Sequence, residues 1–139
     1  MRVLGLDVGD RRIGVAMSDP LGLTAQPLTV IQRRSPTVDA NTIRELIERH
    51  GVTAVVVGLP LTLDGTRGPQ AKKVQGFIDT LRRHIALPIE WVDERLTTVQ
   101  GERALREGNA SRARRKQVID QVAAQLILQQ FLDRHRAMQ

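Results

Sequence analysis

Short apolar runs alternate along the chain with longer segments in which apolar residues recur at helical spacing. The short runs are too brief or too rich in β-branched residues for helices, and they predict five strands, at residues 3–7, 13–17, 23–31, 52–57 and 89–92. The longer segments predict helices from about 37 to 50, 69 to 86, 97 to 107 and 111 to 135. Because Pro27 lacks an N–H donor, it confines the third strand to a sheet edge or a bulge. Three successive strands followed by strands that alternate with helices predict a mixed α/β sheet.

The first strand carries a carboxylate. Its apolar residues, Val3, Leu4 and Leu6, do not alternate strictly, as expected of a strand covered on both faces, and the run ends on Asp7. The turn chemistry of residues 9–12 then predicts a hairpin to the second strand. A buried ionised Asp is costly unless it is compensated, so Asp7 either accepts backbone hydrogen bonds from this turn or faces a cation or metal.

Length and composition exclude several classes of function. The 139 residues suit a single domain, 1–139. With no Cys and three His, thiolate chemistry is excluded and any metal is expected to have oxygen ligands. The net charge of +6 favours an anionic partner, nucleic acid before a membrane surface, while 2% aromatic residues argue against a base-stacking platform. The sequence shows neither a membrane-spanning apolar stretch nor a signal peptide, so we expect a cytoplasmic protein.

Carboxylates recur where the predicted elements end. Asp93 and Glu94 follow the fifth strand. Asp120 lies in the last helix, on the side that carries Ala123, Ala124 and Ile127. That helix is predicted to bury Val118, Ile119, Val122, Ala123, Leu126, Ile127 and Phe131. If Asp120 and one residue of the 93–94 pair meet Asp7, the cluster needs a divalent cation such as Mg²⁺ or Mn²⁺, which could support phosphodiester cleavage.

Each of these carboxylates also has a simpler interpretation. Asp93 could pair only with Arg95, and Asp120 only with Lys116 one helical turn earlier. The basic residues that would face a nucleic acid lie at the first hairpin and after the fifth strand. They are Arg11, Arg12, Arg95, Arg112, Arg114, Arg115 and Lys116. A solvated helix face is the alternative for the cluster at the start of the last helix.

Several of these segments together resemble one known family. They are Gly5–Gly9, Arg12–Ala16, Ser18–Pro20, Val56–Pro60 with Asp64-Gly65, Asp93–Thr98, and Asp120 with Ala123-Ala124. In this order they resemble the YqgF (RuvX) family of Holliday-junction-resolvase-like proteins, also described as pre-16S ribosomal RNA nucleases. Each motif is weak alone, but the resemblance spans essentially the whole chain.

The resemblance implies an RNase H-like fold with a five-stranded sheet of order 3-2-1-4-5 flanked by helices. It also implies a metal-dependent nuclease that trims the 5′ end of precursor 16S ribosomal RNA or resolves Holliday junctions. The family's acidic residues fall by position on Asp7, Glu94 and Asp120. Resolvases of the RuvC type place an acid at the end of the fourth strand, where this chain has Gly58-Leu59.

Two other functions compete with the nuclease. One is a non-catalytic nucleic-acid-binding module, since RNase H-like domains exist that lack the acidic residues. The other is a phosphotransferase of the actin and sugar-kinase type, because Asp-x-Gly followed by Gly-Val-Ala resembles the phosphate loop of those enzymes. They close two lobes over ATP, whereas this chain has length for one lobe. The preference for RNA or DNA, and the choice between monomer and homodimer, stay open.

Overall fold

A five-stranded sheet with the order β3-β2-β1-β4-β5 forms the centre of the molecule. The computed structural model describes residues 2–96 and 112–137, with side chains from 2 to 95 and from 120 to 136. The strands are β1 (Val3–Val8), β2 (Arg12–Ser18), β3 (Ala25–Gln32), β4 (Ala54–Leu59) and β5 (Ile89–Asp93). β2 pairs antiparallel with β1 and β3, whereas β4 runs parallel to β1 and β5. The predicted mixed sheet and its strand order are confirmed.

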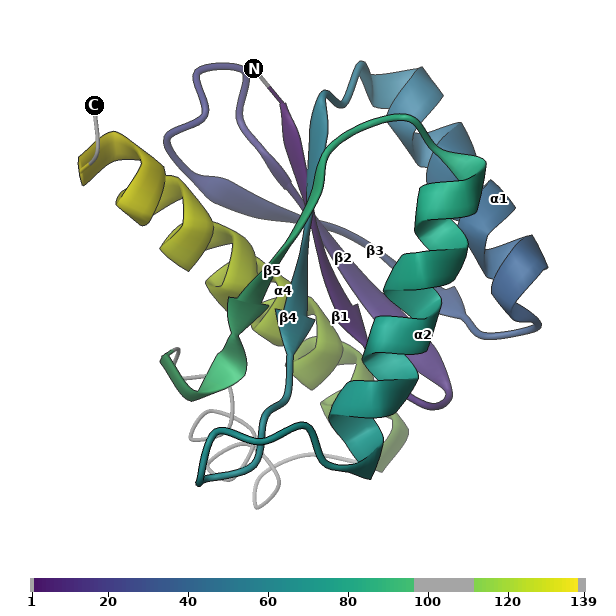
Figure 1. Ribbon diagram of the computed structural model, residues 1–139. Coiled ribbons are helices and arrows are strands. Elements are labelled where there is room, and N and C mark those ends of the chain that lie inside the picture. The colour runs from purple at the N-terminus through teal and green to yellow at the C-terminus, as the bar shows by residue number, and fades with distance from the viewer. Residues whose placement is uncertain (1, 97–111, 138–139) are drawn as a thin grey trace.

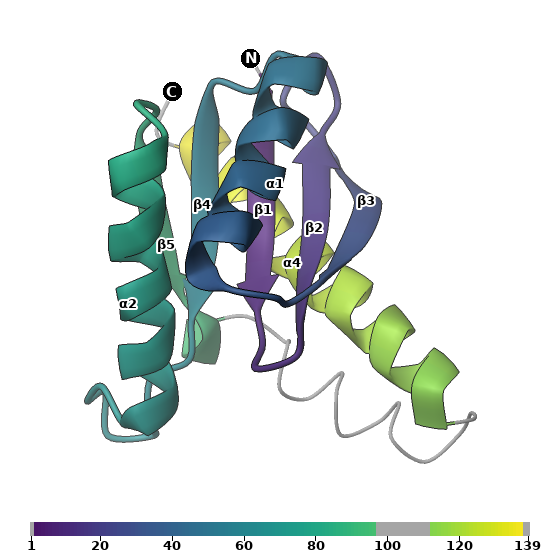
Figure 2. The same cartoon turned by 90° about the vertical axis from the view of Figure 1, so that its right-hand side faces the viewer.

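Helices cover both faces of this sheet. They are α1 (Pro36–His50), α2 (Pro69–His84) and α4 (Arg112–Ala137), and a short 3₁₀ helix, η1 (Glu94–Leu96), follows β5. α1 and α2 lie on one face, and α4 crosses the other (Figures 1 and 2). The helix predicted at 97–107 falls outside the described residues. Among the described helices, none combines the length and the apolar character needed to span a bilayer.

Local sequence explains where these elements begin and end. Ser35 caps α1, because its Oγ accepts a hydrogen bond from the N–H of Val38. Gly51 ends α1 in the left-handed conformation, with φ of 66°. Pro27 lies in the edge strand β3, opposite Ala16, next to an irregularity in the register with β2. The predicted confinement of Pro27 to an edge or bulge is therefore confirmed.

Each face of the sheet buries its own apolar core. The core under α1 and α2 includes Val57 and Phe77, and the core under α4 includes Val56. The predicted buried side of α4 is only partly right. Its fully buried residues are Ala123, Ala124, Ile127, Leu128 and Leu132. Three residues that were expected to be buried are only half-buried, namely Val122, Leu126 and Phe131. The side chains of Val118 and Ile119 lie outside the described residues.

The reason for this shift is the close contact between α4 and the sheet. A Cβ on Gly5 of β1 would lie 2.7 Å from Cβ of Leu128 and 3.2 Å from the carbonyl oxygen of Ala124. The helix therefore rests on a glycine through the side that carries Ala124 and Leu128. This contact turns the neighbouring apolar positions of α4 toward the rim of the interface.

Candidate functional site

Asp7 lies near the carboxyl end of β1, with a glycine beside it on each neighbouring strand. It pairs with Gly14 of β2, and the register of Leu6 with Val57 places the next residues, Asp7 and Gly58, side by side. Side chains at matching positions of neighbouring strands share a face. That face is covered by α4, because a Cβ on Gly14 or on Gly58 would collide with α4 atoms. The buried Asp7, 3% exposed, therefore occupies a row that holds no other side chain on β2 or β4.

Glu94 occupies the space above Gly58. Its Oε1 lies 2.7 Å from the place that a Cβ of Gly58 would take, and the residue is 3% exposed. Glu94 reaches this position because it directly follows Asp93, the last residue of β5, which pairs with Leu59 at the end of β4. Neighbouring strands lie about 4.8 Å apart, so the buried carboxyl groups of Asp7 and Glu94 occupy adjoining positions on the α4 face.

Asp120 lies above the other glycine, Gly14. A Cβ on Gly14 would lie 2.0 Å from the carbonyl oxygen of Asp120 and 3.2 Å from its Cβ. The carboxylate of Asp120 accepts a hydrogen bond of 2.7 Å from Nε of Arg12, two residues before Gly14 on β2. This ion pair is largely buried, with the two side chains 21% and 15% exposed. The side chain of Lys116, the partner considered from the sequence, lies outside the described residues.

The three predicted acidic residues thus lie over three adjacent strands, Glu94 above β4, Asp7 on β1 and Asp120 above β2. In this arrangement the three carboxylates do not converge on one point, as the ligands of a bound metal ion would. In the described part of the chain, no three acidic or histidine side chains lie close enough to hold a metal ion together. Two buried carboxyl groups adjoin each other, and the third is bonded to Arg12.

Asp93 has a different role from its neighbour Glu94. Arg95 donates hydrogen bonds from Nε and Nη2 to the Asp93 carboxylate, the shortest of them 2.7 Å long. The hydrogen bonds from the Arg95 side chain hold the pKa of Asp93 below its usual range. Arg95 Nη1 also donates to the carbonyl oxygen of Leu63, at 3.2 Å. The pairing of Asp93 with Arg95, raised from the sequence, is what the structure shows, whereas the carboxyl group of Glu94 lies over Gly58 on the α4 face.

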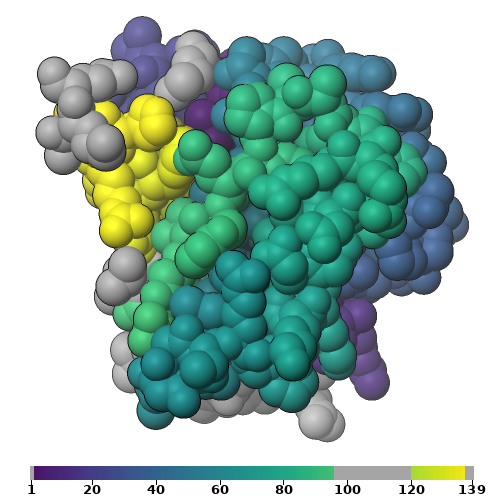
Figure 3. Space-filling view, in the orientation of Figure 1, coloured from purple at the N-terminus to yellow at the C-terminus, as the bar shows by residue number. Residues whose placement is uncertain are grey.

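Through these bonds Arg95 connects the end of β5 with the segment after β4, which contains Leu63 and Asp64. In that segment the carboxylate of Asp64 accepts hydrogen bonds from Thr62 and Thr66, which lower its pKa to about 2. Figure 1 shows the arrowheads of β1, β4 and β5 at the same edge as this segment, and Figure 3 shows the segment, in teal, at the surface there. The carboxyl ends of the parallel strands are therefore bordered by a loop with its own hydrogen-bond network.

The predicted nucleic-acid contacts divide into three groups. Arg11 is exposed at the tip of the β1–β2 hairpin. Arg12 and Arg95 are each paired with a carboxylate. The backbone of residues 112–116 forms the first turns of α4. The side chains of Arg112, Arg114, Arg115 and Lys116 lie outside the described residues.

Sequence reasoning missed two features of the structure, one at this site and one on the opposite face of the sheet. It did not assign a role to Gly14 and Gly58, although glycine inside a strand often marks a close approach of another chain segment. It also missed Asp39, a buried carboxylate in α1 that forms an ion pair with Arg33. The available signal was the position of Asp39 one turn before Ile43, on the apolar side of α1.

A family model and several named relatives match nearly the whole chain. A family model described as "RuvX: Holliday junction resolvase" matches residues 1–134. A relative from Moorella thermoacetica named "Putative pre-16S rRNA nuclease" is 54% identical over 134 residues, 96% of each chain. Relatives of the same name from Clostridium botulinum (strain Hall) and Halothermothrix orenii are 49% and 50% identical over 133 residues. The match covers 96% of this chain in both cases, and 97% and 95% of the two relatives.

Solved structures show a similar fold. RuvC from T. thermophilus, in complex with a Holliday junction substrate, has a TM-score of 0.58 and 18% sequence identity. The match covers 98% of this chain and 96% of that one. A second structure of Thermus thermophilus RuvC has a TM-score of 0.55 at 16% identity and covers 99% and 97% of the two chains. At these identities the likeness concerns the fold, and it confirms the expected RNase H-like architecture.

Proposed function

Because the chain belongs to the RuvX family, we propose that it is a metal-dependent nuclease that hydrolyses phosphodiester bonds in structured nucleic acid. Its proposed main role is processing the 5′ end of precursor 16S ribosomal RNA, after the name of its relatives, with Holliday junction resolution as a second role. The observation that carries the proposal is the pair of buried carboxyl groups on the α4 face, Asp7 on β1 and Glu94 above the adjacent strand β4.

This pair suits a hard divalent cation. Two like charges buried side by side raise each other's energy, and a cation between them removes this cost. Carboxylate oxygens are ligands that Mg²⁺ and Mn²⁺ accept. Asp7 and Glu94 would hold the ion. Asp120 would become a third ligand once its carboxylate gives up the ion pair with Arg12. When bound, such an ion supplies positive charge that favours attack of water on a phosphodiester.

The other residues of the site would bind and orient the nucleic acid. Arg11 is exposed at the hairpin tip, and Arg12, once released from Asp120, would face a phosphate at the same edge. The basic cluster at the start of α4 would contact the backbone of the nucleic acid. It consists of Arg112, Arg114, Arg115 and Lys116. Arg95 acts through Asp93 and Leu63, by holding the border of the site in place.

The substrate is precursor ribosomal RNA or branched DNA, and the cytoplasm, where these nucleic acids lie, is the proposed compartment. The protein would act there as a monomer or homodimer. The net charge of +6 supports a polyanionic substrate.

Asp7→Asn tests the proposal, with Asp79→Asn as the matched control, because Asp79 is exposed on α2. Both variants and the wild type are incubated with Mn²⁺ and with precursor 16S RNA, linear duplex and four-way junction substrates. We expect cleavage by the wild type and by Asp79→Asn, and none by Asp7→Asn, with nucleic-acid binding and the melting temperature retained.

Cleavage by Asp7→Asn at the wild-type rate would refute the assignment of the site. The absence of three converged metal ligands among the described residues favours the non-catalytic binding module as the second candidate. That candidate predicts salt-dependent binding of the same substrates by the wild type, with cleavage in neither Mg²⁺ nor Mn²⁺.

A further inference from the structure

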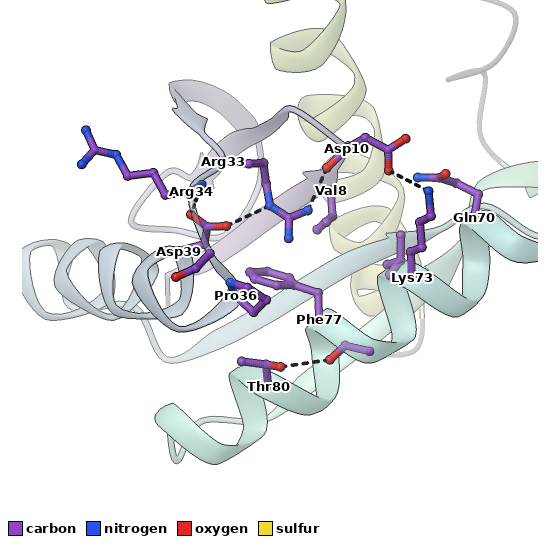
Figure 4. A pocket seen from close by; sticks show the side chains of 14 residues that line it. Val8, Asp10, Arg33, Arg34, Pro36, Asp39, Gln70, Lys73, Phe77 and Thr80 are labelled. Atoms are coloured by element: carbon purple, nitrogen blue, oxygen red, sulfur yellow. Dashed lines mark hydrogen bonds and ion pairs between the residues drawn. The ribbon is translucent and has the colours of Figure 1, made fainter.

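A pocket of about 570 Å³ lies on the other face of the sheet from Asp7 (Figure 4). It is lined by Val8, the next residue on β1, whose side chain points to the opposite face. The hairpin tip at Gly9-Asp10, the start of α1 and the first turns of α2 form its walls. Its volume lies within the range of small-ligand sites, about 300–1,000 Å³.

Arg33 is held in one orientation at this pocket by three contacts. Its Nε donates to Asp39 Oδ2 at 2.9 Å, and its Nη1 donates to the carbonyl oxygen of Gly9 at 2.8 Å. Its guanidinium also lies 4.9 Å from the ring centroid of Phe77. Within the described part of the chain, these bonds engage two of the five N–H donors of an arginine. The group is thus preorganised while retaining donors for a planar or tetrahedral anion.

Asp39 explains why Arg33 is fixed so firmly. The carboxylate is 1% exposed and also accepts a hydrogen bond of 3.0 Å from the backbone N–H of Arg34. A buried charge of this kind is stable only when it is paired and hydrogen-bonded. Asp39 is therefore committed to its neighbours, and its negative charge is balanced by Arg33.

A second cation faces the pocket from α2. Lys73 is exposed and lies 3.4 Å from Asp10, a loose surface pair that an incoming anion could replace. α1 begins at Pro36 in the pocket wall, so the positive end of its dipole points to the same space. Val74 and Phe77 add apolar surface beside these charges. Figure 4 shows Arg33 and Lys73 on opposite sides of the space, with the Arg34 side chain directed away from it.

We propose that this pocket binds the phosphate group of a nucleotide, anchored by Arg33 and Lys73, with the sugar or base against the apolar wall. The phosphate belongs either to a free mononucleotide or to a nucleotide within a nucleic-acid strand. Because the pocket and Asp7 lie on opposite faces of the sheet, binding here does not require the divalent ion of the proposed nuclease site.

Lys73→Gln is the central variant of the test, because the exposed Lys73 can be changed without disturbing the core. Lys72→Gln is its matched control, since Lys72 is the adjacent exposed lysine of α2 and does not line the pocket. Arg33→Lys, which keeps the positive charge beside Asp39, removes the guanidinium fork. Amide resonances are followed by NMR in EDTA during titration with inorganic phosphate and with adenosine 5′-monophosphate.

We expect saturable shifts at Gly9 and Gly76 in the wild type and in Lys72→Gln. In Lys73→Gln and Arg33→Lys the Kd should rise about tenfold, while melting of Lys73→Gln stays at the wild-type temperature. No saturable shift with either probe at millimolar concentration would overturn the proposal. An equal loss in Lys72→Gln would also overturn it, since binding would then follow general surface charge.

A 5′-phosphorylated oligonucleotide and its unphosphorylated counterpart separate the two sources of the phosphate. Tighter binding of the mononucleotide than of either oligonucleotide indicates that the pocket takes a free nucleotide. Tighter binding of both oligonucleotides than of the mononucleotide indicates that it takes a nucleotide within a nucleic-acid strand. EDTA removes the divalent ions that the nuclease requires, so these results do not depend on the outcome of the cleavage assay with Asp7→Asn.

Discussion

Gly14→Ala tests whether the contact between α4 and the sheet holds the acidic residues in place. The added Cβ would lie 2.0 Å from the carbonyl oxygen of Asp120 and 2.6 Å from its carbonyl carbon. These are backbone atoms of a helix, so a change of side-chain rotamer cannot relieve the overlap. Either α4 moves away from β2 or the strand bends, and both changes separate Asp120 from Asp7.

The expected cost follows from two opposing effects. Overpacking a well-filled interface costs typically about 1–3 kcal/mol, and the backbone contact at Gly14 places this variant at the upper end. Gly14 does not have a positive φ, so alanine fits its backbone conformation and recovers about 0.5 kcal/mol by restricting the unfolded chain. A net loss of about 2–3 kcal/mol corresponds to a drop in melting temperature of roughly 10 °C for a domain of this size.

Thermal and urea unfolding followed by circular dichroism measure this loss, with Gly76→Ala as the control. Gly76 lies inside α2, and a Cβ there would meet no atom within 4 Å. The same chemical change should therefore stabilise the protein by about 1 kcal/mol, the helix propensity difference between glycine and alanine. If Gly14→Ala melts at or above the wild-type temperature, the close contact between α4 and β2 is not a constraint on the fold.

Three further variants test individual contacts. Arg12→Gln should lower the free energy of unfolding in EDTA by about 1 kcal/mol and increase the rise in melting temperature on adding Mn²⁺, because Asp120 is then released. Thr62→Val should raise the pKa of Asp64 from about 2 toward its usual 3.8, as read from an NMR titration of its carboxyl carbon. Because the folded pKa is depressed, the stabilising effect of this network is present above about pH 4 and lost as the pH falls toward 2. Asp39→Asn should cost about 3 kcal/mol in urea unfolding by leaving a largely buried guanidinium without its carboxylate.

The sequence predicted the sheet well because its strands are short, β-branched and separated by clear turns. Pro27 and the change of apolar spacing near Pro36 marked an edge strand and a helix start, and both are found in the structure. The register that places Gly58 beside Asp7 could not be predicted in the same way, since it depends on the packing of the parallel strands β1 and β4.

The candidate site was predicted in part. The choice of Glu94 over Asp93 rested on the family resemblance, and it stays a prediction; the structure shows that Glu94 is buried. The pairing of Asp120 with Arg12 was not foreseen, because the two residues are 108 positions apart and no local pattern links them. Long-range ion pairs of this kind follow from how α4 crosses the sheet, which the apolar pattern of one helix does not determine.

The two glycines beside Asp7 connect the fold with the proposed chemistry. A side chain at Gly58 would fill the space that the Glu94 carboxylate occupies, and a side chain at Gly14 would push the backbone of Asp120 away. The fourth strand therefore contributes no acid of its own at its end, but its lack of a side chain admits one from the end of β5. Glu94 can lie beside Asp7, and the backbone of Asp120 can lie over β2, only because Gly58 and Gly14 carry no side chains. It follows that Gly58→Ala should disturb the position of Glu94 more than the stability of the fold, because the groups it displaces are the flexible ends of Glu94 and Ile127.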